Sequence, residues 1–340
     1  MNARTNQVSL DPDLARFFQL AHAQLGPSVT DLARRRERYD RIAELAGAPA
    51  APDTVRRDFH LDAKQGHRVA LRLYTPAQPV SPLALYLHGG GWSAGGIASH
   101  DALCGWLAHQ AGVELAAVDY RLSPEHAHPA ALEDAETALY WALAQKRPVL
   151  LLGDSAGAHL AAAAALRATL HGQASGLAWL GLIYPAASPN AEFPSHHEHA
   201  QSAGLSRGNL LQYWEWFGGV QGRANTDPHF DLLQIRNWHG LPPTHILSAE
   251  LDPLRDEAQA LAGIMSASGI NVTLRCAPAM PHGFARFVMQ SNAAMQEMKG
   301  FARALQRSFG NCRESVVGYR RDHGPDEMKP RRAQHKFTPD

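Results

Sequence analysis

Residues 153–157 read Gly-Asp-Ser-Ala-Gly and fit the pattern G-x-S-x-G around Ser155. The motif follows the apolar run 149–152 and opens an alanine-rich stretch that reaches residue 170. A serine nucleophile on a tight turn between a strand and a helix needs small neighbours, because the chain reverses sharply there. Short patterns of this kind also arise by chance, but the flanking strand-like and helix-like runs favour Ser155 as a nucleophile.

A second motif, His-Gly-Gly-Gly-Trp at residues 88–92, follows another apolar run at 83–87. Successive glycines let the backbone turn and point N–H groups at a ligand oxygen. We expect N–H groups of this loop, together with that of Ala156, to hold the oxyanion of a tetrahedral intermediate. The loop has neither phosphate-binding spacing, G-x-G-x-x-G or G-x-x-x-x-G-K-[ST]. A plain tight turn would not explain why both motifs follow strand-like runs.

With these motifs the chain resembles the hormone-sensitive-lipase-like family of α/β-hydrolase esterases, of the acetyl esterase or carboxylesterase type. The matching stretches occur in the family's order and cover about residues 70–305; they are 86–92, 118–126, 129–135, 153–157, 251–257 and 282–284. The resemblance implies an α/β-hydrolase fold, which is a mostly parallel sheet with helices on both faces and a helical cap. It implies Ser155 as the nucleophile, Asp252 as the triad acid and His282 as the general base.

The positions of these residues along the chain support the same roles. Asp252 ends a strand-like run and His282 lies in a loop after another, so both can stand with Ser155 at the carboxyl edge of a parallel sheet. The order Ser, Asp, His is the one that α/β-hydrolases use. Asp256 competes with Asp252, but it lies inside the helix that is expected to follow. The oxyanion donors are expected among Gly89, Gly90, Gly91 and Ala156, with Gly90 and Gly91 preferred in the loop.

The elements that must position these residues are short apolar or alternating runs separated by helical stretches. The strand-like runs are 69–74, 83–87, 115–118, 149–152, 180–184, 245–251 and 272–276. The helical stretches are 101–111, 130–143, 156–170, 254–267 and 285–305. Strands that alternate with helices indicate crossover connections and a mostly parallel sheet covered on both faces.

The same pattern of strand-like and helical stretches divides the chain into segments. Residues 1–47 are predicted to be an N-terminal helical cap segment, and residues 55–187 and 241–308 the α/β-hydrolase catalytic domain. Residues 188–240 carry no clear strand and are predicted to be a cap insertion over the carboxyl edge of the sheet. Residues 311–340 are polar and charged and are predicted to be a disordered tail.

The proposed insertion holds a group of aromatic residues, namely Tyr213, Trp214, Trp216 and Phe217. They could anchor the insertion to the sheet or line an acyl pocket, and the sequence does not separate these roles. A capped, enclosed pocket favours short- or medium-chain acyl esters over emulsified fat.

The composition bounds the partners and the location. Lys+Arg and Asp+Glu are 32 each, so the formal net charge is zero and a nucleic-acid partner is not expected. Three widely spaced cysteines show no disulfide or zinc pattern and fit a reducing compartment. The first residues lack the apolar segment of a signal peptide, and no run is long enough to cross a bilayer. We therefore expect a cytoplasmic protein with a small-molecule ester substrate and no membrane partner, and we leave its oligomeric state open, a homodimer included.

No cofactor and no metal are expected. The histidines of the proposed insertion, His196, His197 and His199, lie beside Glu198, but the H-E-x-x-H spacing of a zinc helix is absent. The predicted activity is therefore that of a serine carboxylic-ester hydrolase with an acyl-enzyme intermediate.

Other functions stay open at this stage. The family commonly has a second glycine after the serine turn, whereas this chain has Ala158, and the run 155–160 also resembles kynurenine-formamidase-like α/β-hydrolases. Hydrolysis of an aryl formamide or another amide is therefore an alternative. A non-catalytic, ligand-binding homologue is a second, although all three triad residues are present. An interaction protein acting through the charged tail is a third.

Overall fold

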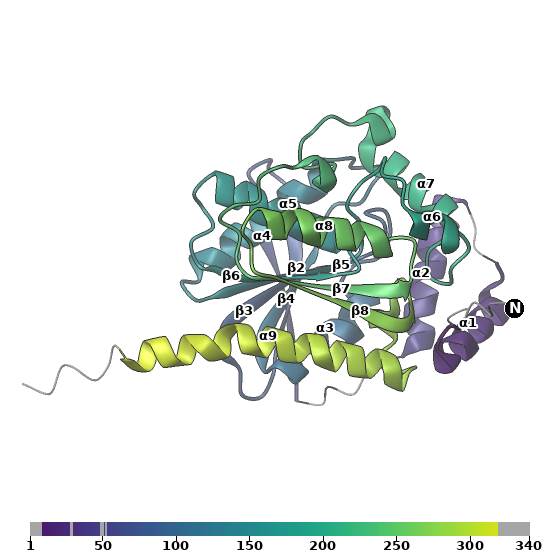
Figure 1. Ribbon diagram of the computed structural model, residues 1–340. Coiled ribbons are helices and arrows are strands. Elements are labelled where there is room, and N and C mark those ends of the chain that lie inside the picture. Colours follow the sequence, from purple (N-terminus) through teal and green to yellow (C-terminus); the bar gives the residue numbers. More distant parts are fainter. Residues whose placement is uncertain (1–8, 28–29, 48–50, 52, 319–340) are drawn as a thin grey trace, which may run out of the picture.

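The computed structural model describes residues 9–27, 30–47, 51 and 53–318, and its centre is an eight-stranded sheet (Figure 1). The strands are β1 (Val55–Asp62), β2 (Arg68–Thr75), β3 (Val80–Leu87), β4 (Val113–Asp119), β5 (Val149–Asp154), β6 (Leu177–Ile183), β7 (Thr244–Leu251) and β8 (Val272–Pro281). Their order across the sheet is β1-β2-β4-β3-β5-β6-β7-β8. Only β2 runs antiparallel to its neighbours, so the sheet is mostly parallel, as predicted.

Helices cover both faces of the sheet. The large helices are α3 (Ile97–Ala111), α4 (Ala130–Ala144), α5 (Ala156–Leu170), α8 (Arg255–Ala267) and α9 (Asn292–Gly318). Side chains of α4, α5 and α8 share one hydrophobic core, and those of α3 and α9 share the other, on opposite sides of the strands (Figure 1). Because both faces are covered, the central strands are continuous apolar runs; residues 83–87 and 149–152 are fully buried. The predicted α/β-hydrolase fold is confirmed.

Two elements differ from the sequence prediction. Strand β1 was not expected, since its residues are mostly polar and largely exposed. It is an edge strand held by pairing with β2, and its Asp58 faces Arg72 across the ladder with an Oδ1–Nε distance of 2.6 Å. The single helix predicted over 285–305 is instead a short 3₁₀ turn, η3 (Phe284–Phe287), followed by α9. Ser291 separates the two, because its hydroxyl accepts a hydrogen bond from the first turn of α9.

Helices at the N-terminus form a cap. They are α1 (Pro12–Leu25) and α2 (Leu32–Ala46), and each begins after an aspartate that accepts a hydrogen bond from the first turn, Asp11 for α1 and Asp31 for α2. Phe17 of α1 packs on Phe287 at 4.9 Å between ring centroids. In Figure 1 both helices lie beside the end of the sheet toward which β7 and β8 point.

Residues 188–240 form short helices and no strand. The helices are α6 (Pro194–Glu198), α7 (Arg207–Gly218), η1 (Gly219–Ala224) and η2 (Leu232–Gln234). In Figure 1, α6 and α7 lie above α2, on the same side of the molecule as the N-terminal cap. The predicted domain boundaries stay predictions. At the C-terminus, α9 continues to Gly318, past the start of the predicted tail, and residues 319–340 lie outside the described residues.

Candidate active site

The register of the sheet brings Asp252 and His282 together. Leu251 and Pro281 are paired across β7 and β8, and each is followed directly by one of the two predicted triad residues. Nδ1 of His282 lies 2.7 Å from Oδ2 of Asp252. The other oxygen of Asp252 accepts a hydrogen bond from the N–H of Leu254 at 2.9 Å, so the fully buried carboxylate is fixed on both sides.

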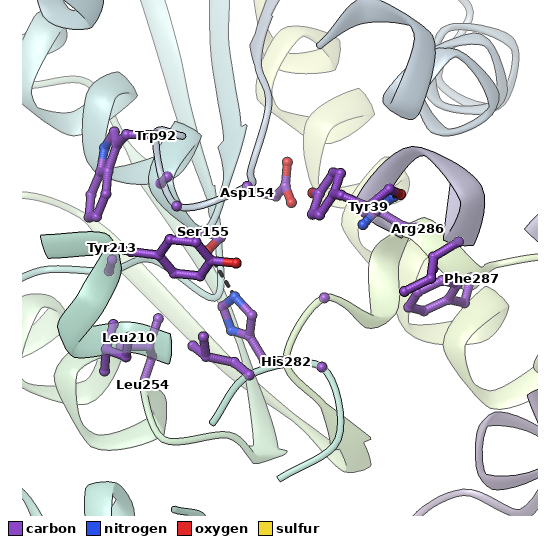
Figure 2. A pocket seen from close by; sticks show the side chains of 18 of the residues that line it. Tyr39, Trp92, Asp154, Ser155, Leu210, Tyr213, Leu254, His282, Arg286 and Phe287 are labelled. Atoms are coloured by element: carbon purple, nitrogen blue, oxygen red, sulfur yellow. Dashed lines mark hydrogen bonds between the residues drawn. The ribbon is translucent and has the colours of Figure 1, made fainter. Parts of the chain in front are cut away.

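Ser155 completes a continuous chain of hydrogen bonds. It stands between β5 and α5 with φ 54° and ψ −118°, a strained conformation that an ordinary residue rarely adopts. This sharp turn exposes the side chain at the edge of the sheet, and Oγ lies 2.8 Å from Nε2 of His282 (Figure 2). A hydroxyl, an imidazole and a carboxylate in this order can perform nucleophilic acyl transfer.

Glycines are required on both sides of Ser155, because neighbouring backbone segments pass too close to leave room for a side chain. A Cβ placed on Gly157 would lie 2.0 Å from the carbonyl oxygen of Leu87 at the end of β3. A Cβ on Gly153 would lie 2.3 Å from the carbonyl oxygen of Gly157. The small residues of the motif therefore let the first turn of α5 rest against the strand that leads into the glycine loop.

Replacing Gly157 by alanine is expected to lower the free energy of unfolding by about 3 kcal/mol, because neither backbone can retreat without moving a central strand. The measurement is the urea unfolding curve. Gly263→Ala is the matched control: Gly263 is exposed on α8 and a Cβ there meets nothing within 4 Å. This control should gain roughly 0.5–1 kcal/mol. Equal stability of the two variants would contradict the packing argument.

Two N–H groups of the glycine loop have no hydrogen-bond partner among the described residues. No hydrogen bond within the described residues uses the N–H of Gly90 or Gly91, and both residues line the pocket beside Ser155. They have φ values of 124° and 59°, which favour glycine. Ala156 is the first residue of α5, where an N–H has no partner within the helix. Gly89 departs from the prediction, because its N–H already donates to Asp154 at 2.8 Å.

Asp154 links the serine turn to the glycine loop. Its Oδ1 accepts hydrogen bonds from Tyr86 Oη and from the N–H of Gly89, both at 2.8 Å, and Nε2 of His100 lies 3.5 Å away. Burial alone would raise the pKa of this carboxyl, but His100 and the hydrogen bonds from Tyr86 and Gly89 lower it to about 2. The carboxylate therefore stays ionised and holds the loop next to Ser155.

Asp256, the competing carboxylate, forms its hydrogen bonds with partners other than His282. Its Oδ1 accepts a hydrogen bond from Nε of Arg255 at 2.8 Å, and its Oδ2 accepts one from the N–H of Ser195 at 2.9 Å. Ser195 also donates its hydroxyl to the carbonyl of Pro253 at 2.7 Å. Residues 188–240 therefore brace the loop that follows Asp252, a role that the sequence did not indicate.

The histidines of this segment point to separate partners. Nε2 of His196 lies 2.8 Å from Oε1 of the buried Glu257, and His199 lies beside Arg255. His197 is exposed and faces Glu192. Across the described residues, no group of three or more His, Cys, Asp or Glu side chains is arranged to hold a metal ion.

A pocket opens beside Ser155 and His282, and it is lined from three parts of the chain. About 110 Å³ of it can be reached by the centre of a water molecule. Its walls include Phe18, Tyr39 and Ile42 from the N-terminal cap; Leu205, Leu210 and Tyr213 from residues 188–240; and Leu254, Arg286 and Phe287 from the catalytic domain. The sequence predicted that the N-terminal segment and residues 188–240 cap the site, but it did not indicate which side chains face the serine.

Some aromatic residues of α7 anchor this helix to the glycine loop, and another lines the pocket. Trp214 and Phe217 are fully buried, and each packs on Trp92 of the glycine loop at 4.3 Å between ring centroids. Tyr213 instead lines the pocket and lies against Gly91, where a Cβ would be 2.3 Å from the Tyr213 ring. The group therefore serves both roles that the sequence left open, through different members.

Comparison with known proteins supports the same chemistry. A family model described as alpha/beta hydrolase fold matches residues 84–286. Ethyl acetate hydrolase of Pseudomonas putida is 31% identical over 88% of this chain and 99% of its own length. Carboxylesterase NlhH of Mycobacterium tuberculosis is 32% identical over 71% of this chain and 79% of its own length.

A solved structure agrees with the arrangement of most of the chain. A hyperthermophilic esterase from the archaeon Pyrobaculum calidifontis superposes with a TM-score of 0.79 at 28% sequence identity. The match covers 88% of this chain and 98% of that one. The fold, and not only the motifs, is therefore shared with esterases.

Proposed function

Since this chain belongs to the hormone-sensitive-lipase-like family of α/β-hydrolases and is a carboxylesterase, we propose that it acts through a Ser155–His282–Asp252 triad on esters with short- to medium-chain acyl groups. The observation that carries this proposal is the unbroken hydrogen-bonded chain from the Ser155 hydroxyl through His282 to the buried Asp252. The family membership gives the reaction class, and the geometry supports the role that we propose for each side chain.

In the first half of the reaction, Nε2 of neutral His282 accepts the Ser155 proton while Oγ attacks the ester carbonyl carbon. Asp252 accepts the Nδ1–H bond of His282, which fixes the tautomer and stabilises the imidazolium. The N–H groups of Gly90, Gly91 and Ala156 stabilise the oxyanion. His282 then returns the proton to the departing alcohol, and the acyl group stays on Ser155.

In the second half, water takes the place of the alcohol. His282 accepts a proton from the water, the resulting hydroxide attacks the acyl carbonyl, and the carboxylic acid leaves as Ser155 recovers its proton. The steps use the Ser155 hydroxyl, His282, the buried Asp252, backbone N–H groups and one water molecule.

The size of the pocket supports the short acyl chain. Only about 110 Å³ of the pocket can be reached by the centre of a water molecule, and such a small space favours a short acyl chain over a long one. The relative named for ethyl acetate hydrolysis is consistent with this size. The apolar walls next to Ser155, which include Leu210, Tyr213 and Leu254, suit an aliphatic chain.

A panel of p-nitrophenyl esters from acetate to laurate, with an aryl formamide beside them, tests this proposal. We expect kcat/KM to be highest between acetate and hexanoate and to fall at least roughly tenfold toward laurate, because longer chains exceed the pocket. Turnover of the formamide should be slower than that of the matching ester. A preference for laurate would contradict the proposed acyl size, and faster formamide turnover would favour the amide alternative.

Two further parts of the proposal concern location and assembly. We propose a reducing compartment such as the cytoplasm, because Cys104 and Cys276 are both free thiols. None of the described helices combines the length and the apolar character that a membrane crossing needs. A homodimer and the lack of a nucleic-acid partner stay predictions from the sequence.

A further inference from the structure

The pocket beside Ser155 has two chemically different sides. Figure 2 shows Leu210, Tyr213 and Leu254 on one side, and Tyr39, Arg286 and Phe287 across the open space from them. The first side is mostly aliphatic and comes from residues 188–240 and the loop after β7. The second side comes from the N-terminal cap and η3, and it carries a guanidinium group.

Arg286 is the only lysine or arginine among the described residues that line the pocket. Its guanidinium carbon lies 3.8 Å from the centroid of the Tyr39 ring, and Nη2 donates to the carbonyl of Tyr39 at 3.2 Å. Nε is buried and has no hydrogen-bond partner among the described residues. A buried donor without an acceptor is rare in a folded protein, so the guanidinium group keeps hydrogen-bonding capacity that no group of the described residues uses.

Among the described residues, no ion pair neutralises the charge of Arg286. No carboxylate of the described residues lies within ion-pair distance of the Arg286 guanidinium. Asp40 is the nearest in effect: burial raises the pKa of Asp40, and the positive charge of Arg286 opposes that rise only in part. Asp154 is the only carboxylate among the described pocket-lining residues, and its Oδ1 is engaged by Tyr86 and Gly89. An anionic group of a ligand can therefore approach Arg286 without displacing a carboxylate of the protein.

Tyr39 adds a donor beside the guanidinium. Its side chain lines the pocket, and no hydrogen bond within the described residues uses its hydroxyl. Burial raises the pKa of Tyr39, so the hydroxyl keeps its proton and can donate it in a hydrogen bond. A planar guanidinium and a phenol at one wall match the oxygens of a carboxylate.

We propose that Arg286 and Tyr39 form a subsite for an anionic oxygen group on the substrate, so that the enzyme prefers short esters that carry a carboxylate. Monoesters of short dicarboxylic acids and acetyl esters of hydroxy acids have this chemistry. The inference rests on the proposed function, because the ester bond must lie at Ser155 while the carboxylate reaches Arg286.

Two pairs of esters test this preference, each with one anionic and one neutral member of similar size. Monoethyl glutarate and ethyl valerate place the charge on the acyl side, and 4-acetoxybenzoate and 4-methylphenyl acetate place it on the alcohol side. Release of acid is followed by pH-stat titration. The wild-type enzyme should have the higher kcat/KM for the anionic member of at least one pair.

Arg286→Met should lower kcat/KM for that anionic ester roughly 10- to 100-fold, the usual effect of losing a charge-assisted hydrogen bond. Turnover of the neutral partner should fall by a clearly smaller factor, so that the ratio of the two kcat/KM values reports the loss of the charge. Arg275→Met is the matched control, because Arg275 is an exposed β8 residue paired with Glu297 and does not line the pocket. Arg286→Lys, which keeps the charge but loses the planar fork, should show a smaller loss.

Two results would overturn the subsite: a wild-type preference for the neutral member of both pairs, or an equal loss on both members in Arg286→Met, which indicates a structural role only. If Arg286→Met does not fold, a preference unchanged by Arg286→Lys and by Tyr39→Phe would overturn it as well. Failure of the proposed function would appear differently, as absent turnover of every ester. In that case calorimetry of monoethyl glutarate with the Ser155→Ala protein decides the subsite, since binding must exceed that of ethyl valerate.

Discussion

Replacing Ser155 by alanine is expected to lower kcat with p-nitrophenyl acetate by a factor on the order of 10⁶. The substitution removes the only atom that forms the covalent bond with the acyl group, so His282 has no nucleophile to activate. The backbone N–H groups of Gly90, Gly91 and Ala156 remain, and they leave some residual stabilisation of the oxyanion. The steady-state release of p-nitrophenolate measures this loss.

Ser308→Ala serves as the control for this substitution. Ser308 lies on α9, where its hydroxyl donates to the carbonyl of Leu305 at 2.6 Å, away from the pocket. The same chemical change there should leave kcat unchanged. A Ser155→Ala enzyme within tenfold of the wild type would show that a different group performs the attack.

Replacing Asp252 by asparagine is expected to lower kcat by a factor of about 10⁴, the effect measured for this change in another serine triad. An amide has the same shape as the carboxylate and can still accept the hydrogen bond from Leu254. It cannot stabilise the imidazolium, however, and it can hold His282 in the tautomer that carries its proton on Nε2. A His282 in that tautomer has no free nitrogen to accept the Ser155 proton.

The Asp256→Asn variant tests which of the two neighbouring carboxylates, Asp252 or Asp256, is the triad acid. Asp256 is bonded to Arg255 and Ser195 and not to His282. We expect its kcat to stay within about threefold of the wild type. If instead Asp256→Asn caused the large loss and Asp252→Asn the small one, the assignment of the triad acid would be wrong.

The sequence predicted the central strands well because burial on both faces turns each of them into a continuous apolar run. Strand β1 escaped prediction since it lies at the exposed edge, where β2 supplies the hydrogen bonds and no apolar pattern is needed. The triad candidates were found through motifs at strand ends, and the pairing of Leu251 with Pro281 explains why Asp252 and His282 meet.

The parts that the sequence did not indicate depend on contacts between distant segments. Gly90 and Gly91 were preferred over Gly89 as oxyanion donors, but the sequence could not exclude Gly89, because only the fold brings its N–H to Asp154. Arg286 follows His282 closely, but its environment comes from Tyr39, 247 positions earlier in the chain. Such a pairing leaves no pattern in a single sequence.

The most direct test of Ser155 as the catalytic nucleophile is to identify the residue that reacts with a p-nitrophenyl alkylphosphonate. Such a compound phosphonylates an activated nucleophile. Mass spectrometry of the digested protein should place the adduct on Ser155, with loss of esterase activity in step with release of one p-nitrophenolate per chain. The Ser155→Ala protein should stay unlabelled. Loss of activity with the adduct on another residue, or a fully labelled Ser155 in an active enzyme, would contradict the account.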